Sequence, residues 1–264
     1  MRTIIAPTDF SDISMNAVNY AADMSLALNA KLLILHAAEL SINAGSVYTE
    51  PTEDEIKIEN KLDALKKNIL ERTGNKIPVN SHQVSGLIEN EIIKMCDYQN
   101  PLAIVMATKG TNIKEQFFIG SITVYLSKNL KYPVIVVPRN ASYKPINKIV
   151  LATDLENLYD LPLEKISNIV SVFNAKLDIV HVYKTDEKFD VMTSRISELT
   201  NYLKALNPQF HFIKNKNVYD AITDFAKKND ADLILTFPKK HAFFHKSESK
   251  QLIFNAPFAV MTIQ

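Results

Sequence analysis

Glycine, cysteine and tryptophan are scarce in this sequence, and the scarcity of cysteine excludes the class of small disulfide-stabilised proteins. The 264 residues contain five glycines, one cysteine and no tryptophan. A single cysteine rules out an internal disulfide framework and fits a reducing compartment, so we expect a cytoplasmic protein. Cys96 stands in a helical pattern beside Ile92, Ile93 and Met95, which predicts a small buried hydrophobic residue and not a nucleophile.

Long apolar runs and an excess of charge of one sign are also missing. No apolar stretch approaches the roughly 18–20 residues that span a bilayer. Residues 1–9 read as a strand and lack the apolar region of a signal peptide. The formal net charge of +1 gives no field that would attract nucleic acid or anionic lipid. We therefore expect neither nucleic acid nor a membrane as a partner.

The chain repeats itself, and the repeat predicts its domain organisation. Thr-Asp-Phe at 8–10 recurs as Thr-Asp-Leu at 153–155, and Ile-Leu-His at 34–36 recurs at the same offset as Ile-Val-His at 179–181. The link that follows the first copy contains two prolines and is poorly suited to a helix. We predict two tandem copies of one domain, over residues 1–140 and 141–264.

Apolar periodicity predicts strands that alternate with helices in each copy. Continuous runs such as residues 32–35 are typical of strands buried on both faces. The predicted fold is therefore α/β, with two tandem open parallel five-stranded sheets and helices on both faces. The predicted strands are 2–7, 31–37, 78–84, 102–107, 134–137, 148–152, 176–182, 210–214, 232–237 and 258–263. The predicted helices are 14–28, 53–72, 87–99, 121–130, 160–173, 187–206, 218–229 and 247–253.

The segment 106–123 is the candidate binding feature, because a strand leads into a loop with Gly110 and then into a helix at Gly120. Backbone N–H groups at a glycine-containing loop and a helix N-terminus can hold an anion such as phosphate. In an open α/β sheet, ligands bind at the carboxyl ends of the strands, where the strand order reverses. Asp9 follows the first strand and could accept a hydrogen bond from an adenine amino group or a ribose hydroxyl. Alternatively, Asp9 or Ser11 caps the next helix.

The other polar candidates have structural alternatives. His36 and His181 lie near the ends of buried strands, without a carboxylate or cysteine at metal-ligand spacing, which favours structural roles. His241 and His245 would share one helix face but lack a third ligand, so we predict no metal site. Ser121 could bind a phosphate, cap its helix, or do both.

The chain resembles a tandem universal stress protein over nearly its full length. The phosphate loop of that family has the form Gly-x2-Gly-x9-Gly-Ser/Thr, and this chain has Ala107-x2-Gly110-x9-Gly120-Ser121. Residues 7–11, His36-Ala37 and Ile122-Thr123 also match the family. The resemblance implies a Rossmann-like strand order 3-2-1-4-5 in each copy and pairing of the two copies through their fifth strands. It leaves a homodimer open.

By this resemblance the first copy would bind ATP or another adenine nucleotide such as AMP, with or without Mg²⁺. The aspartate and the residue after the strand-two histidine would hold adenine and ribose. The loop backbone and the Gly-Ser-x-Thr segment would hold the phosphates. The implied site residues are Asp9, Ala37, Met106, Ala107, Lys109, Gly110, Gly120, Ser121, Ile122 and Thr123.

Two departures from the family pattern bear on binding. Ala107 replaces the first loop glycine; its Cβ would cost about 1–2 kcal/mol if the backbone there needs φ > 0, and little if φ is negative. In the second copy the loop is dismantled: all five glycines lie in the first copy, Phe237 stands at the position of Ala107, and Pro238 removes an N–H donor. We therefore expect the second copy to pair or dock without binding nucleotide.

Three functions stay open at this point. The first is a cytoplasmic stress protein that binds an adenine nucleotide, the second a ligand-free stress-response interaction protein in which Ala107 marks a lost site. The third is an enzyme, such as a slow ATPase or a nucleotidyltransferase. Residues 7–11 lack the His-x-Gly-His or Ser-Gly-Gly loop of adenylylating relatives, so we assign no catalytic residue and expect slow ATP hydrolysis at most.

Overall fold

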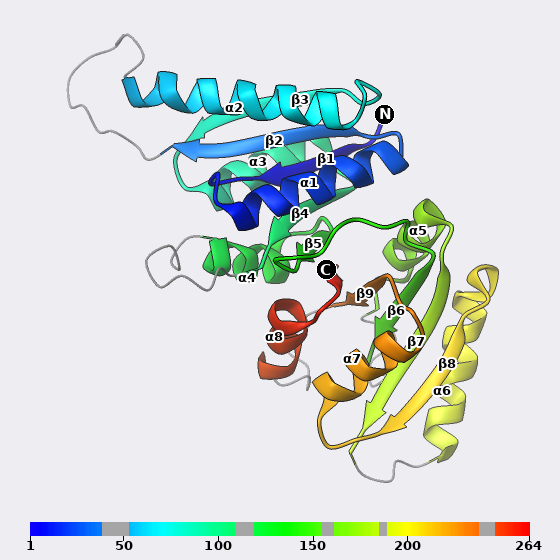
Figure 1. Ribbon diagram of the computed structural model, residues 1–264. Helices are drawn as coiled ribbons and strands as arrows, with labels where there is room; N and C mark the ends of the chain where they lie inside the picture. Colours follow the sequence, from blue (N-terminus) through cyan, green and yellow to red (C-terminus); the bar gives the residue numbers. More distant parts are fainter. Residues whose placement is uncertain (39–52, 109–118, 155–160, 185–188, 238–245) are drawn as a thin grey trace.

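The computed structural model describes the whole chain apart from residues 39–52, 109–118, 155–160, 185–188 and 238–245 (Figure 1). Ten strands form one sheet. They are β1 (Thr3–Pro7), β2 (Lys31–Ala38), β3 (Val79–Ser85), β4 (Ala103–Ala107), β5 (Val134–Val137), β6 (Lys148–Ala152), β7 (Lys176–Tyr183), β8 (Gln209–Lys214), β9 (Leu233–Thr236) and β10 (Ala259–Thr262).

The strand order of this sheet is β3-β2-β1-β4-β5-β10-β9-β6-β7-β8. Each half therefore has the order 3-2-1-4-5, and neighbouring strands within a half are parallel. Where the halves meet, β5 and β10 are antiparallel, with Val136 opposite Val260. The predicted α/β fold is confirmed, and the ten strands lie in one sheet where two sheets were expected. Both strands at the junction are apolar edges, and pairing satisfies their backbone N–H and C=O groups.

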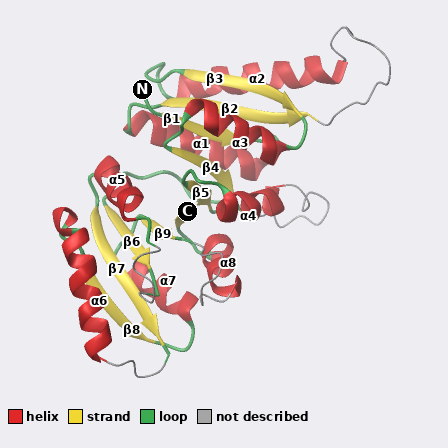
Figure 2. Cartoon of the chain, turned by 180° about the vertical axis from the view of Figure 1, so that it is seen from behind, coloured by secondary structure: helices red, strands yellow, loops and turns green. Residues whose placement is uncertain are grey.

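Helices cover both faces of the sheet (Figures 1 and 2). On one face lie α1 (Asp12–Ala27), α2 (Glu53–Arg72), α5 (Leu163–Phe173) and α6 (Phe189–Tyr202). On the other lie α3 (Ile88–Gln99), α4 (Ile119–Asn129), α7 (Val218–Lys228) and α8 (Lys246–Asn255).

Among the helix boundaries that differ from the predicted ones, two differ for clear local reasons. The predicted helix 160–173 begins at Leu163, because Pro162 occupies the N-cap position and disfavours helical angles in the residue before it. The predicted helix 187–206 ends as α6 at Tyr202, and a separate 3₁₀ turn spans Lys204–Leu206 before the left-handed Asn207.

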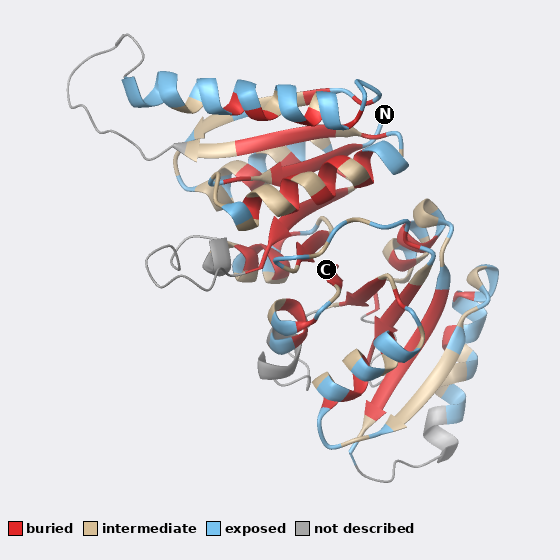
Figure 3. Cartoon of the chain, in the orientation of Figure 1, coloured by how far each residue is buried: buried red, intermediate tan, exposed pale blue. Residues whose placement is uncertain are grey.

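The strands at the centre of each half are buried on both faces, as their continuous apolar runs predict (Figure 3). In β1, Ile4 and Ala6 pack under α1 while Ile5 packs toward the opposite helices, because successive strand residues point to opposite faces. Burying a side chain such as Ile4 or Ile5 contributes about 1.5–3 kcal/mol. This burial holds the strand ends, and the residues that follow them, in fixed positions.

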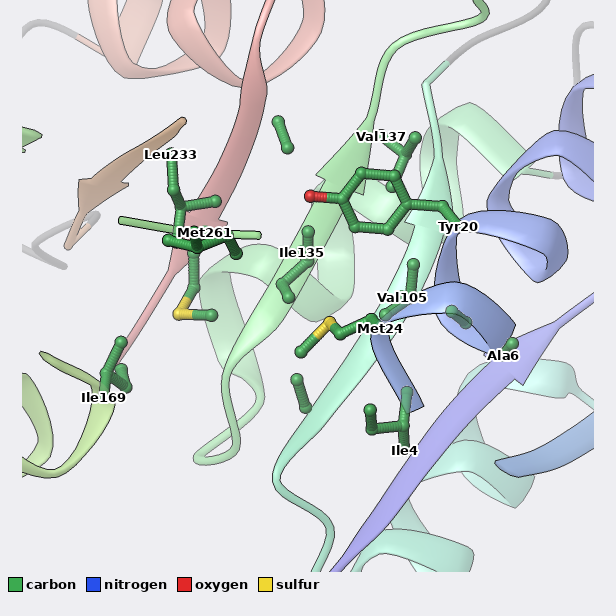
Figure 4. Close-up of a cluster of buried hydrophobic side chains, with 14 of the residues drawn as sticks. Ile4, Ala6, Tyr20, Met24, Val105, Ile135, Val137, Ile169, Leu233 and Met261 are labelled. Atoms are coloured by element: carbon green, nitrogen blue, oxygen red, sulfur yellow. The ribbon is translucent and has the colours of Figure 1, made fainter. Parts of the chain in front are cut away.

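The core on the α1 face continues across the β5–β10 junction. Figure 4 shows Ile135 of β5 with Met24 of α1 on one side and Met261 of β10 on the other. Ile135 and Met261 are register partners, and both are buried. The two halves therefore share one apolar layer on this face.

Candidate functional site

The carboxyl ends of β1, β2 and β4 meet at one edge of the first half-sheet. The chain builds β1, β2 and β3 in one direction and then returns to add β4 and β5 on the other side of β1. The strand order reverses between β1 and β4, and this is the position at which open α/β sheets bind ligands. The candidate site is built around this edge.

The turn after β1 is held by a network around Thr8, whose side chain is buried. The Thr8 hydroxyl shares a 3.0 Å hydrogen bond with the Ser14 hydroxyl and accepts one of 3.0 Å from the backbone N–H of Phe10. The Asp9 N–H donates to the Ser14 hydroxyl at 3.3 Å. Ser14 was not a predicted site residue. Its spacing of three from Ser11, at a helix start, is the signal that could have found it.

Asp9 itself is exposed, and its carboxylate is held in place. One oxygen, Oδ1, accepts hydrogen bonds from the Ser11 N–H at 3.0 Å and from the Ser11 hydroxyl at 2.6 Å. Ser11 is the N-cap of α1 and accepts from the Ser14 N–H at 3.3 Å. The capping role that the sequence left open between the two residues thus belongs to Ser11. Among the described residues, no hydrogen bond to the second carboxylate oxygen of Asp9 accompanies these two.

Phe10 and His36 form the neighbouring wall. Phe10 takes a left-handed backbone angle, φ 62°, which is uncommon for a bulky residue. Its ring centroid lies 4.6 Å from that of His36, and the Lys61 ammonium lies 5.5 Å above the Phe10 ring. His36 Nδ1 lies 2.8 Å from the carbonyl oxygen of Thr8, so this nitrogen donates the bond. The imidazole is therefore a structural tie between β2 and β1, as predicted. The next residue, Ala37, is half-buried and pairs with Val84 of β3.

The end of β4 resolves the question raised by Ala107. Ala107 is the last residue of β4, pairs with Val137 of β5 and is absent from the residues with positive φ. Its backbone is therefore extended, and its Cβ packs into the core under α1. The cost of a Cβ at positive φ does not arise here. Met106, before it, is also buried, on the opposite face.

The first turn of α4 follows on the same side of the edge. The helix begins at Ile119, two residues before the predicted start, so Gly120 and Ser121 lie inside its first turn. Ile122 is half-buried, and the buried Thr123 hydroxyl donates to the Ala107 carbonyl oxygen at 3.3 Å. N–H groups in a first turn have no partner within the helix and can face an anion. Lys109 and Gly110 lie outside the described residues.

The second half repeats part of this arrangement. His181 Nδ1 lies 3.1 Å from the Thr153 carbonyl oxygen, as His36 does with Thr8, and Asp154 follows in the position of Asp9. Phe237, in the position of Ala107, is half-buried and packs against the core. Pro238 and the two histidines at 241 and 245 lie outside the described residues.

The remaining chemical candidates are structural. Cys96 is fully buried, as predicted, and burial raises the pKa of its thiol to about 12, which keeps it protonated. Among the residues that the structure describes, no group of three or more His, Cys, Asp or Glu side chains could hold a metal ion. In the same part of the chain, no helix is both long and apolar enough to cross a membrane.

Taken together, these features define a Rossmann-like α/β protein with a candidate ligand edge at the topological switch point of its first half. The universal stress protein family model matches residues 1–138, and the chain belongs to that family. Two universal stress proteins of Methanocaldococcus jannaschii are similar to about half of it. MJ0531 is 29% identical over 142 residues, which are 52% of this chain and 82% of MJ0531. MJ0577 is 29% identical over 161 residues, which are 53% of this chain and 97% of MJ0577.

The whole fold has a counterpart among solved structures. A universal stress protein from Archaeoglobus fulgidus superposes on 99% of this chain and 96% of its own, with a TM-score of 0.72 and 18% identity. The likeness concerns the fold, and it extends over both halves.

Proposed function

We propose that this universal stress protein binds an adenine nucleotide, ATP or AMP, in a first domain formed by residues 1–140. The observation that carries the proposal is the placement of Asp9. Its exposed carboxylate is held by Ser11 at the topological switch point, beside the end of β4. Membership of the family adds support, because the motif residues of its nucleotide-binding members match this chain at these positions.

Each part of the edge suits one part of the nucleotide. The Asp9 oxygen that does not accept from Ser11 could accept from an adenine amino group or a ribose hydroxyl, and the main chain at Ala37 lies at the end of the neighbouring strand. The first turn of α4, with Gly120 and Ser121, offers N–H groups to the phosphates. A Mg²⁺ ion, where present, would be held largely by phosphate oxygens and water, as this small hard cation prefers.

The extended backbone at Ala107 supports binding over a ligand-free role. The loss of the first loop glycine was the argument for a ligand-free protein. That argument required, at residue 107, a backbone angle that only glycine adopts cheaply. Ala107 has no such angle. The methyl group points into the core and away from the ligand edge.

The proposal gives the second domain, residues 141–264, a different task. Its β10 covers the apolar edge of β5, and its Phe237 replaces the residue at which the phosphate loop would begin. We assign it to pairing with the first domain and to docking, without nucleotide. Both domains would work in the cytoplasm, consistent with a single buried thiol.

Isothermal titration of the full chain with ATP, ADP and AMP tests the proposal. We expect one nucleotide per chain. Asp9→Asn keeps the shape of the side chain and should weaken binding about tenfold or more, as expected when a charged hydrogen-bond acceptor is lost. Asp12→Asn is the matched control, because Asp12 is also exposed and lies in the first turn of α1.

Asp154→Asn tests the second domain at the equivalent position and should leave the titration unchanged. A titration without heat, together with an unchanged melting temperature, would overturn the proposal. Two nucleotides per chain would overturn the role given to the second domain.

A further inference from the structure

Asn16, a half-buried residue in the first turns of α1, holds the link between the two halves. Its side-chain amide donates to the carbonyl oxygen of Pro138 at 3.2 Å and to that of Ala141 at 3.1 Å. The Ala141 N–H donates to the Pro138 oxygen at 3.0 Å, so the two acceptors belong to one closed turn. One amide group therefore fixes the first turn of the link, although it lies 122 positions earlier in the chain.

A second contact, one helical turn further along α1, continues this docking. The Tyr20 ring meets the Tyr143 ring edge to face, with 5.2 Å between the centroids. Tyr20 is buried, while Ala141 and Tyr143 are half-buried and pack against the core beneath α1. The link thus lies along α1 and is not a free tether.

Both sides of the candidate ligand edge have hydrogen bonds to residues near the contact between Asn16 and Pro138. On one side, the Asp9 N–H is bonded to the hydroxyl of Ser14, two residues before Asn16 in the same helix. On the other side, Thr108 follows the end of β4, and its N–H donates to the Val137 carbonyl oxygen at 3.0 Å. Val137 directly precedes Pro138, the first acceptor of Asn16. The amide therefore joins the Asp9 turn to the end of β4 by a route outside the sheet.

The second half has a different residue at this position. The residue that matches Asn16 is Leu161, which is buried, has no side-chain donor and lies before the start of α5. The half with the dismantled loop thus has no amide side chain at this position.

We propose that Asn16 is a positioning residue of the nucleotide site, and that it couples occupancy of that site to the docking of residues 138–143 on α1. The inference rests on the proposed function, since it needs a nucleotide at the Asp9 edge. A nucleotide that contacts both Asp9 and the end of β4 draws together the two parts that Asn16 holds. Docking of the link is thereby strengthened, and by linkage a loosened link weakens nucleotide binding by the same factor.

The test uses the full chain and Asn16→Asp, which keeps the size of the side chain and replaces its two donors by acceptors. We expect ATP affinity to fall about five- to twentyfold, within the usual range of coupling between sites. Asn16→Gln, which retains the amide donors, should recover part of the loss. Asn229→Asp is the matched control, because the Asn229 amide donates at 2.9 Å to Phe225 within its own helix in the second half.

Amide hydrogen exchange gives a measurement that would not respond to ATP if Asn16 had a purely structural role. In the wild type, ATP should slow exchange at residues 139–143, and in Asn16→Asp it should have no such effect. If the wild type binds ATP while Asn16→Asp binds it equally well, or while exchange at these amides is unchanged, the coupling is overturned. If the wild type binds no nucleotide, the proposed function and the coupling both fail, and the titration distinguishes that result from the previous one.

Discussion

The Thr123 hydroxyl donates a 3.3 Å hydrogen bond to the carbonyl oxygen of Ala107, and both residues are buried. The bond ties α4 to the last residue of β4. It thereby sets where the first turn of α4, with Gly120, stands relative to the strand ends. Ala107 and Thr123 both occupy positions of the family motif, and here their hydrogen bond holds β4 and α4 together beside the candidate site.

Ala107→Gly tests whether the extra methyl group hinders the nucleotide. Since the backbone is extended and the Cβ lies in the core, glycine should bring no more than a twofold gain in ATP affinity. It should lower the free energy of unfolding by about 0.5–1 kcal/mol through the added freedom of the unfolded chain. Titration calorimetry and urea denaturation measure the two effects. A tenfold tighter complex would show that the methyl group does obstruct the ligand.

Thr123→Val removes the hydroxyl and keeps the branched shape. We expect a loss of about 1 kcal/mol in the free energy of unfolding, because the Ala107 oxygen loses a buried donor. Nucleotide affinity should fall as well, since α4 is less firmly placed. Thr200→Val is the control, because the exposed Thr200 hydroxyl donates at 2.7 Å to the Ile196 carbonyl oxygen within α6. Equal effects of the two substitutions on affinity would contradict the prediction.

Most of the fold could be predicted from apolar periodicity and from the repeat. The helix 53–72 and the strands 134–137 and 148–152 coincide with α2, β5 and β6. Boundaries failed where a local residue overrode the pattern, as Pro162 does at the start of α5. Periodicity also could not show that the sheets merge, because the partner of an edge strand leaves no mark in its own sequence.

The site was only partly within reach of the sequence. Motif positions located Asp9 and Ala107, but the angle at Ala107 depends on its pairing with Val137, which is a tertiary contact. Asn16 and Pro138 are far apart in the chain, and an asparagine in a helix gives no local signal of such a bond. The buried Asp178 interrupts the apolar run of β7, and this break is visible in the sequence. Its partner His211 lies on another strand, so the sequence around Asp178 does not indicate the pair.

Asp178 and His211 form a partly buried pair, with Oδ1 and Nε2 3.1 Å apart, where the first half has Leu33 at the position of Asp178. His211→Ala should cost about 1.5–3 kcal/mol in the free energy of unfolding, because the buried Asp178 carboxylate loses its hydrogen-bond partner. The double variant Asp178→Leu/His211→Phe should recover most of that loss, since apolar replacement of a buried pair is often neutral or stabilising.

Urea denaturation of the wild type and the two variants measures both results. A loss below about 0.5 kcal/mol for His211→Ala, the scatter expected of independent surface changes, would show that the pair contributes nothing.

Tyr20 of α1 and Tyr143 of the link meet edge to face and should make stability fall at high pH. Burial, and then the negative charges of Asp232 and Asp23, raise the pKa of Tyr143 from 10.0 to about 12, and burial also raises the pKa of Tyr20. The unfolded chain ionises these phenols near pH 10, whereas the folded chain keeps them neutral. The stability that Tyr143 provides is therefore complete below pH 10 and is lost between pH 10 and about 12, and that of Tyr20 is lost at higher pH still.

Urea denaturation at a series of pH values, with tyrosinate absorbance followed in parallel, measures this fall. Tyr143→Phe should flatten the decline between pH 10 and 12, because the unfolded state then has one phenol fewer to ionise. Tyr202→Phe removes an exposed phenol and should leave the slope as it is in the wild type. If Tyr143→Phe and Tyr202→Phe give the same slope, the phenol of Tyr143 ionises as freely in the folded protein as in the unfolded one. The docking of the link on α1 would then be looser than its contacts with Asn16 and Tyr20 require.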